Sequence, residues 1–447
     1  MKTILLFGAG RSATVLIDYL LNEAENENWK IFIVDADLNL AKSKTNDSYY
    51  AEAISFDIND EIKRKEFISK ADIVISLLPP ALHTIVAITC VDENKNLLTA
   101  SYIDETIKNL KSTIENKGLL FLCEMGLDPG IDHMSAMKMI DEIHEEGGKI
   151  NSFKSHCGGL VAPESDSNPW HYKISWNPRN IVMAGKAGAI YKINNQIKKI
   201  TDYFLFADCN KISVPGLYDL AYYPNRDSLS YIPLYGLEET ETFIRTTLRH
   251  PDFCIGWNYI IKANLTDDDT LNAVFDVRNA SIKEWLDKNI AAQSNADSFE
   301  EFLDEYVDEK DRVLVKKLFD YLDLFSDEKI PQTAKYSVDI LQYLVERKLA
   351  LMPNDRDMIV MVHEIESTSG NQQTAFRSTL IVKGEDSLRT AMAKTVGLPL
   401  GIAAKLILNG KIKLKGLHIP TSKEIYLPVL EELESYGIIF HDEKITG

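Results

Sequence analysis

The N-terminal part of the chain alternates short apolar runs with segments of helical spacing. Thr3 to Phe7, Ile31 to Val34, Ala53 to Phe56, Ile73 to Leu78 and Asn96 to Ala100 each predict a buried strand. Amphipathic stretches between these runs predict helices. Strands that alternate with helices in this way indicate an α/β fold with a parallel sheet.

The turn after the first predicted strand carries a glycine motif. Its sequence, GAGRSA at positions 8–13, has the G-x-G-x-x-A spacing of a dinucleotide-binding turn. The first glycine makes the turn, the second lets backbone approach a pyrophosphate, and the small alanine lets the helix pack on the strand. The glycines alone are weak evidence, and a structural turn is the alternative. The order of strand, glycines, helix, strand and acid makes the prediction specific.

The acid that ends the second predicted strand bears on the choice of cofactor. Asp35 lies near the offset at which a carboxylate accepts hydrogen bonds from the adenosine ribose. A carboxylate there repels a 2′-phosphate, and neither Ala36 nor Asp37 supplies the arginine that is usual in NADP sites. We therefore predict NAD, with NADP as the alternative that Lys42 and Lys44 leave open.

A second turn, GLDPGIDH at 126–133, lies between a predicted strand and a segment of helical spacing. Pro129 disfavours the α region for Asp128, and Gly130 can take a positive φ, so we expect Asp128 to be extended at a strand tip. Ligands bind beyond the carboxyl ends of parallel strands, which makes Asp128 a candidate acid, base or orienting group. An Asx turn or a helix cap is the alternative.

Further candidates lie at other predicted strand ends. Ser101 and Tyr102 follow one such strand, although Ser101 by itself is better explained as a helix cap. Cys157 precedes two glycines, a pattern that suggests backbone brought close to a ligand. A buried small hydrophobe is the commoner role for such a cysteine.

Three arginines are candidate anion-binding groups. Arg226 lies in a predicted turn, where it is either a donor to loop carbonyls or a clamp for a carboxylate. Arg245 and Arg249 are spaced i, i+4 on a helix predicted from Glu239 to Arg249, and they add the same possibility.

Composition narrows the class of protein. The formal net charge of −18 over 447 residues argues against binding to nucleic acid or to an anionic membrane surface, so an anionic substrate needs local arginines. Five cysteines without C-x-x-C spacing and nine histidines without i, i+4 pairs predict a reduced interior and no metal. No apolar run approaches the ~18 residues of a membrane span, so we expect a soluble cytoplasmic protein.

Motifs along the whole chain resemble those of saccharopine reductases, the L-glutamate-forming saccharopine dehydrogenases. The motifs are GAGRSATVL, VISLLPPALH, TASYI, EMGLDPGIDH, SHCGGLVAPES, YKISW, YPNRDS, TLRH, TAMAKTVGLP and SKEIYLPVLEEL. The resemblance implies a Rossmann domain at 1–130 and 385–447, an α+β substrate domain with a mixed sheet at 131–236 and 352–384, and an inserted all-helical domain at 237–351. It also implies reversible, pyridine-nucleotide-dependent cleavage of saccharopine to L-glutamate and 2-aminoadipate 6-semialdehyde.

The resemblance implies site residues at the positions of this chain that match the motifs of the family. Together with the glycine turn, the implied cofactor contacts are Gly8, Gly10, Arg11, Ser12, Ala13, Asp35, Ala36, Asp37, Asp57, Leu77, Leu78, Ala100, Ser101, Leu127, Asp128, Pro129 and Trp176. The implied saccharopine contacts are Ser101, Tyr102, Asp128, Arg226, Thr247, Leu248 and Arg249. The implied acid/base side chains are Asp128, Tyr102 and Cys157. Fungal members have an arginine where this chain has Ala36, which again favours NAD.

Two other functions compete with this prediction. A dehydrogenase of a carboxylated polyamine would share the cofactor half, and a non-catalytic NAD-binding regulator would keep the fold without the chemistry. The predicted partner is the small molecule saccharopine, with no nucleic acid and no membrane, and a homodimer remains open.

Overall fold

The structure is a computed structural model that describes residues 1–268 and 280–446. By its internal contacts the chain divides into two compact units. Unit 1 comprises residues 1–149, 368–372 and 380–441. Unit 2 comprises residues 150–367, 373–379 and the C-terminal residues from 442.

Unit 1 is built on a parallel sheet whose strands lie in the order β16-β6-β5-β4-β1-β2-β3. The strands are β1 (Lys2–Phe7), β2 (Trp29–Asp35), β3 (Ala51–Ser55), β4 (Ile73–Ser76), β5 (Asn96–Thr99), β6 (Leu120–Leu122) and β16 (Gly416–His418). The helices are α1 (Thr14–Glu27), which follows a 3-10 turn at Arg11–Ala13, α2 (Leu38–Lys44), α3 (Glu61–Lys70), α4 (Pro80–Asp92), α5 (Glu105–Asn109), α6 (Lys111–Asn116), α7 (Ile131–Glu145), α14 (Ala391–Leu408) and α15 (Lys423–Ser435). The predicted α/β fold with a parallel sheet is confirmed.

The continuous apolar runs in these strands follow from helices covering both faces of the sheet. One core cluster contains Leu5, Phe7, Val74, Leu97 and Phe121, all without measurable exposure. Such strands leave only their ends accessible. The residues that follow β1, β2, β4, β5 and β6 therefore carry any site that this unit has.

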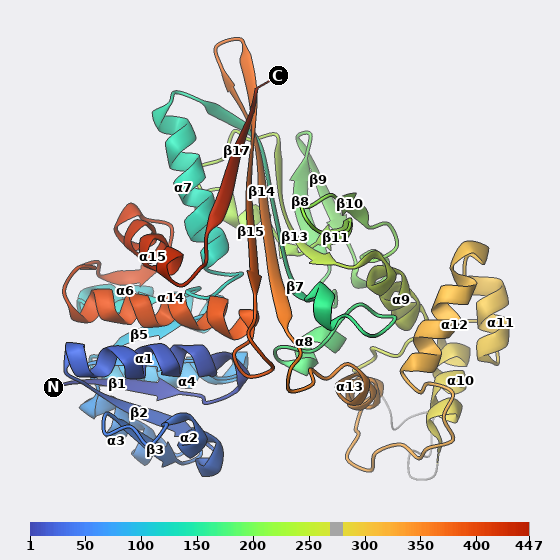
Figure 1. Ribbon diagram of the computed structural model, residues 1–447, viewed down its shortest axis with the longest axis horizontal. Coiled ribbons are helices and arrows are strands. Elements are labelled where there is room, and N and C mark those ends of the chain that lie inside the picture. Colours follow the sequence, from blue (N-terminus) through green and yellow to red (C-terminus); the bar gives the residue numbers. More distant parts are fainter. Residues whose placement is uncertain (269–279, 447) are drawn as a thin grey trace. The chain divides into compact units, whose positions relative to one another are not determined.

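A C-terminal helix completes unit 1. α14 packs against α1 (Figure 1). A Cβ added at Gly397 would lie 2.9 Å from the backbone nitrogen of Leu16. A Cβ at Gly401 would lie 2.5 Å from the ring of Tyr19, so both glycines permit the close approach of the helices. By length and composition α14 passes the test for a membrane-spanning helix, which the sequence analysis did not anticipate. However, 72% of it is buried inside the protein, as expected of a core helix.

Unit 2 contains a mixed sheet in the order β10-β11-β13-β7-β14-β15-β17, with β8, β9 and β12 attached at its side. The strands are β7 (Lys149–Val161), β8 (Ala189–Ile193), β9 (Gln196–Ile200), β10 (Asn210–Ile212), β11 (Leu220–Pro224), β12 (Arg226–Asp227), β13 (Thr242–Arg249), β14 (Asp357–Ser369), β15 (Gln372–Lys383) and β17 (Phe440–Thr446). The helices are α8 (Pro178–Val182), α9 (Pro251–Lys262), α10 (Ile282–Gln293), α11 (Phe299–Tyr306), α12 (Arg312–Tyr321) and α13 (Ser337–Lys348).

The helix predicted from Glu239 to Arg249 is wrong, because this segment forms strand β13. The segment is rich in β-branched and aromatic residues, which favour strands, and an i, i+4 spacing of arginines fits a period of two as well as a helix. The predicted all-helical stretch 237–351 therefore begins with a strand, and its first helix is α9. Residues 269–279 of that stretch lie outside the described residues, and the predicted domain boundaries stay predictions.

Candidate active site

The glycine turn between β1 and α1 brings two strand ends together. Gly8 has a φ of +98°, and a Cβ there would lie 2.7 Å from the carbonyl oxygen of Leu77, the residue after β4. A Cβ at Gly10 would meet nothing within 4 Å. Gly8 is therefore required by packing, whereas Gly10 borders open space that a diphosphate can enter. The turn fits a dinucleotide.

Carboxylates gather at the end of β2. Asp35 Oδ2 accepts a 2.8 Å hydrogen bond from the backbone N–H of Ala9, and its Oδ1 accepts one of 3.0 Å from the N–H of Asp37. Asp37 in turn caps α2. The carboxylate of Asp35 is thus hydrogen-bonded to the glycine turn. Its contact with the adenosine ribose stays a prediction.

Lys42 and Lys44, which kept NADP as an alternative cofactor, differ in their surroundings. Lys44 Nζ donates a 2.7 Å hydrogen bond to Thr14 Oγ1, and burial lowers the pKa of Lys44. Lys42 is exposed in the last turn of α2. Asp57, another predicted cofactor contact, is exposed after β3 and accepts 2.9 Å and 3.0 Å hydrogen bonds from Asn59.

The turn that carries Asp128 connects β6 to α7. Gly130 has a φ of +147°, and a Cβ there would lie 2.0 Å from the carbonyl oxygen of Gly126, so the positive φ predicted for Gly130 is confirmed. The Asp128–Pro129 peptide bond is cis. Asp132 Oδ1 accepts a 2.6 Å hydrogen bond from the N–H of Gly130, so a carboxylate other than Asp128 binds the backbone at the start of α7.

The structure brings two of the predicted acid/base residues together. Tyr102 follows β5, Asp128 follows β6, and both side chains are half-buried. Tyr102 Oη lies 3.5 Å from Asp128 Oδ1, at the upper limit for a hydrogen bond. This pair sits at the carboxyl edge of the parallel sheet.

A buried network behind this pair was missed by the sequence analysis. His133 Nε2 lies 2.9 Å from Glu124 Oε2, and Glu124 Oε1 accepts a 3.3 Å hydrogen bond from the N–H of Ile103. Glu124 takes a positive φ of 57°, which is uncommon for a residue other than glycine. The network holds the segment that follows Tyr102 against the start of the Asp128 turn. Its only sequence signal was that Glu124 and His133 begin and end the motif EMGLDPGIDH.

The remaining predicted contacts of unit 1 lie around the same edge. Leu77 and Leu78 follow β4, and Ala100 and Ser101 follow β5, all of them half-buried, whereas Leu127 and Pro129 are buried. Arg11 and Ser12 form the 3-10 turn before α1, Arg11 exposed and Ser12 half-buried.

In unit 2 the most informative candidate is Arg249. Its side chain is buried, and its guanidinium lies over the rings of Tyr172 and Phe253, 5.3 Å and 5.6 Å from their centroids. Nη1 donates a 2.8 Å hydrogen bond to the carbonyl of Leu248, while Nε has no hydrogen-bond partner in the described part of the chain. Within residues 1–268 and 280–446 no carboxylate pairs with Arg249. A buried cation without an anion is costly, so this site is suited to an anionic ligand.

Cys157 lies next to the strand that ends in Arg249. It is buried in β7, and it pairs in register with Thr247 of β13. The expectation that the following glycines approach a ligand stays a prediction, but a Cβ at Gly158 would lie 2.5 Å from the carbonyl oxygen of Leu248. Gly158 is needed because two strands pack closely.

The other two predicted residues of unit 2 differ in exposure. Arg226 is exposed in the short strand β12 with a φ of +50°, next to Ala189 of β8. Trp176 is half-buried and packs against the aromatic core of the unit.

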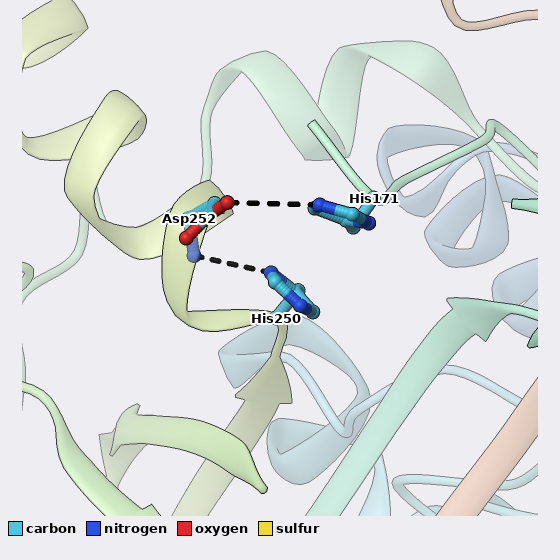
Figure 2. Close-up of side chains that lie close together, drawn as sticks. All are labelled: His171, His250 and Asp252. Atoms are coloured by element: carbon cyan, nitrogen blue, oxygen red, sulfur yellow. Dashed lines mark hydrogen bonds and ion pairs between the residues drawn. The ribbon is translucent and has the colours of Figure 1, made fainter. Parts of the chain in front are cut away.

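His171, His250 and Asp252 form a cluster whose ligand atoms lie within 4.8 Å of one another (Figure 2). His250 Nδ1 accepts a 3.2 Å hydrogen bond from the N–H of Asp252 and so caps α9. The two imidazoles stack with centroids 3.8 Å apart, and His171 lies between the carboxylates of Asp166 at 2.6 Å and Asp252 at 3.6 Å. Capping, stacking and ion pairing account for the cluster, so the prediction of no metal stays a prediction.

The parallel sheet, the glycine turn and the acidic end of β2 define a Rossmann-type dinucleotide-binding protein. Comparison with known families makes this more specific. Residues 4–122 match the saccharopine dehydrogenase NADP binding domain, and residues 126–438 match the saccharopine dehydrogenase C-terminal domain. The chain belongs to the saccharopine dehydrogenase family.

Individual relatives agree with this assignment. The saccharopine dehydrogenase [NADP(+), L-glutamate-forming] of Saccharomyces cerevisiae is 34% identical over 100% of both chains. The structure of apo saccharopine dehydrogenase (L-Glu forming) from the same yeast matches with a TM-score of 0.87 and 32% identity, covering 100% of both chains. The alpha-aminoadipic semialdehyde synthase of Arabidopsis thaliana is 34% identical over 97% of this chain but 44% of its own length. The chain thus spans about half the length of such synthases.

Proposed function

We propose that the chain catalyses pyridine-nucleotide-dependent oxidation of the CH–NH bond of saccharopine, giving L-glutamate and 2-aminoadipate 6-semialdehyde, or the reverse condensation. The observation that carries the proposal is the pairing of Tyr102 with Asp128 at the carboxyl edge of a dinucleotide-binding sheet. The relatives from Saccharomyces cerevisiae are called L-glutamate-forming saccharopine dehydrogenases, which supports the same substrate and one of the two products.

The side chains named above have complementary roles in this proposal. A bound dinucleotide would accept a hydride from the lysyl ε-carbon of saccharopine, the carbon that becomes the aldehyde carbon of the semialdehyde. Asp128 or Tyr102 takes the proton of the secondary amine and activates the water that attacks the resulting imine. Arg226 and Arg249 bind substrate carboxylates, which an acidic protein can hold only through local cations. Cys157 is the weaker acid/base candidate, since it is buried in β7.

One spectrophotometric assay tests the proposal. Purified protein with saccharopine and NAD or NADP is expected to form reduced nicotinamide, and glutamate and the semialdehyde should accumulate with it. Turnover of a carboxylated polyamine instead of saccharopine would favour the rival dehydrogenase. Dinucleotide binding without turnover of any substrate would favour the regulator.

We further propose that NAD is preferred over NADP, although the yeast relatives carry NADP(+) in their names. Asp35 and Asp37 place two carboxylates at the end of β2, and Ala36 between them offers no cation for a 2′-phosphate. We expect kcat/KM to be higher with NAD. Ala36→Arg should shift the ratio toward NADP, while Ala36→Leu should leave it unchanged. A clear preference of the unmodified protein for NADP would contradict the proposal.

Arg226 allows a separate test of substrate binding. Arg226→Met should raise KM for saccharopine and leave the affinity for the dinucleotide unchanged, because the lost group binds a carboxylate of the substrate only. The measurement is KM for saccharopine beside a fluorescence titration with reduced dinucleotide. Equal losses in both would show that Arg226 is structural.

A further inference from the structure

His83 of α4 links the ends of two neighbouring strands in unit 1. Its Nδ1 lies 2.8 Å from the hydroxyl of Ser76, the last residue of β4. Its Nε2 lies 2.7 Å from the hydroxyl of Ser101, just beyond the end of β5. Thr99, which pairs in register with Ser76, is 3.4 Å from Nδ1 through its own hydroxyl. One imidazole therefore joins the two segments that supply the predicted contacts after β4 and β5.

Both of these contacts suit a neutral imidazole. The His83 side chain is 3% exposed, and burial lowers the pKa of His83 to about 4. A neutral imidazole has one donor and one acceptor nitrogen, and a serine hydroxyl can serve as either partner. The ring thus satisfies Ser76 and Ser101 at once in either tautomer, without a buried charge.

The consequence concerns Ser101, whose side chain is half-buried and whose N–H donates a 3.2 Å hydrogen bond to Thr99 Oγ1. A serine hydroxyl ordinarily rotates among several partners. Here one contact of its oxygen is already taken by a buried ring, so its remaining hydrogen-bonding capacity points in a fixed direction. Such a hydroxyl binds a ligand without first losing rotational freedom.

We propose that His83 is a positioning residue, which fixes the Ser101 hydroxyl for its contact with the bound dinucleotide and substrate. The proposal rests on the proposed function in so far as Ser101 belongs to the active site. His83 itself does not touch the ligand in this account. It acts through Ser101 alone, and the effects of the two residues are therefore coupled.

A double-mutant cycle tests this coupling. His83→Phe and Ser101→Ala should each lower kcat/KM for saccharopine by about 10-fold, the effect of one lost hydrogen bond. The double variant should lose no more than Ser101→Ala alone. His83→Gln, which keeps a hydrogen-bonding group, should recover part of the loss. Thr84→Val is the matched control on the same helix, because Thr84 bonds Asp104 instead of Ser101.

Other outcomes overturn the proposal. If the losses in kcat/KM multiply in the double variant, His83 does not act through Ser101. The same conclusion follows if His83→Phe keeps full activity and the stability of the unmodified protein. An unchanged Ser101→Ala variant would leave His83 with nothing to position. The dissociation constant of the reduced dinucleotide, measured without substrate on the same four proteins, gives a second double-mutant cycle. If the unmodified protein binds the dinucleotide but does not turn over saccharopine, the proposed function is wrong. The cycle of dissociation constants still tests the role of His83.

Discussion

Asp128→Ala is expected to lower kcat by about 10²-fold or more, the usual contribution of a positioned proton-transfer group. Asp128 lies on the turn that follows the parallel strand β6, a turn that requires Gly130, and its carboxylate is next to Tyr102 Oη. Asp132, and not Asp128, accepts the hydrogen bond from the backbone N–H of Gly130 at the start of α7. The measurement is kcat under saturating saccharopine and dinucleotide, with thermal unfolding as a check of the fold.

Asp60→Asn is the matched control for this prediction. Asp60 is a carboxylate in the same unit, but it caps α3 by accepting a 3.1 Å hydrogen bond from the N–H of Lys63. Its replacement should change stability by at most about 1 kcal/mol and leave kcat unchanged. An effect of less than about threefold for Asp128→Ala would remove Asp128 from the proton-transfer groups.

The parts of the fold that the sequence predicted depend on local patterns. Strands β1, β2, β4 and β5 follow from apolar runs that are largely buried, and the positive φ of Gly130 follows from turn chemistry. Residues from Glu239 to Arg249 were assigned wrongly because apolar and charged residues there fit more than one period. Tertiary pairing with β7 and β11 decided between them.

The parts that the sequence could not predict depend on contacts between distant residues. From the sequence, His83 is one more buried position of an apolar helix. Only the structure shows that its ring lies between Ser76 and Ser101. In the same way, nothing in the sequence separates Arg249, which is buried without a carboxylate partner among the described residues, from the exposed Arg226. Burial and partners distinguish these arginines, and both are properties of the folded chain.

This distinction leads to a second large effect. Arg249→Met should raise KM for saccharopine by about 10-fold to 100-fold, because a hydrogen bond to a charged group contributes about 1.5–3 kcal/mol. The value of kcat should change little if the guanidinium binds the ground state and the transition state alike. Arg249→Lys should recover only part of the loss, since an ammonium lacks the planar fork that matches a carboxylate.

Stability separates this role from a structural one. In the free protein the buried guanidinium has no carboxylate partner among the described residues, so an apolar side chain of similar length removes a desolvation cost. The free energy of unfolding of Arg249→Met should therefore be unchanged or higher while KM rises. Arg245→Met is the control on the same strand, since Arg245 is also buried and lies over the ring of Tyr231 at 4.4 Å. It should leave KM unchanged. Loss of stability in Arg249→Met with no change in KM would mean that Arg249 supports the fold instead of binding the substrate.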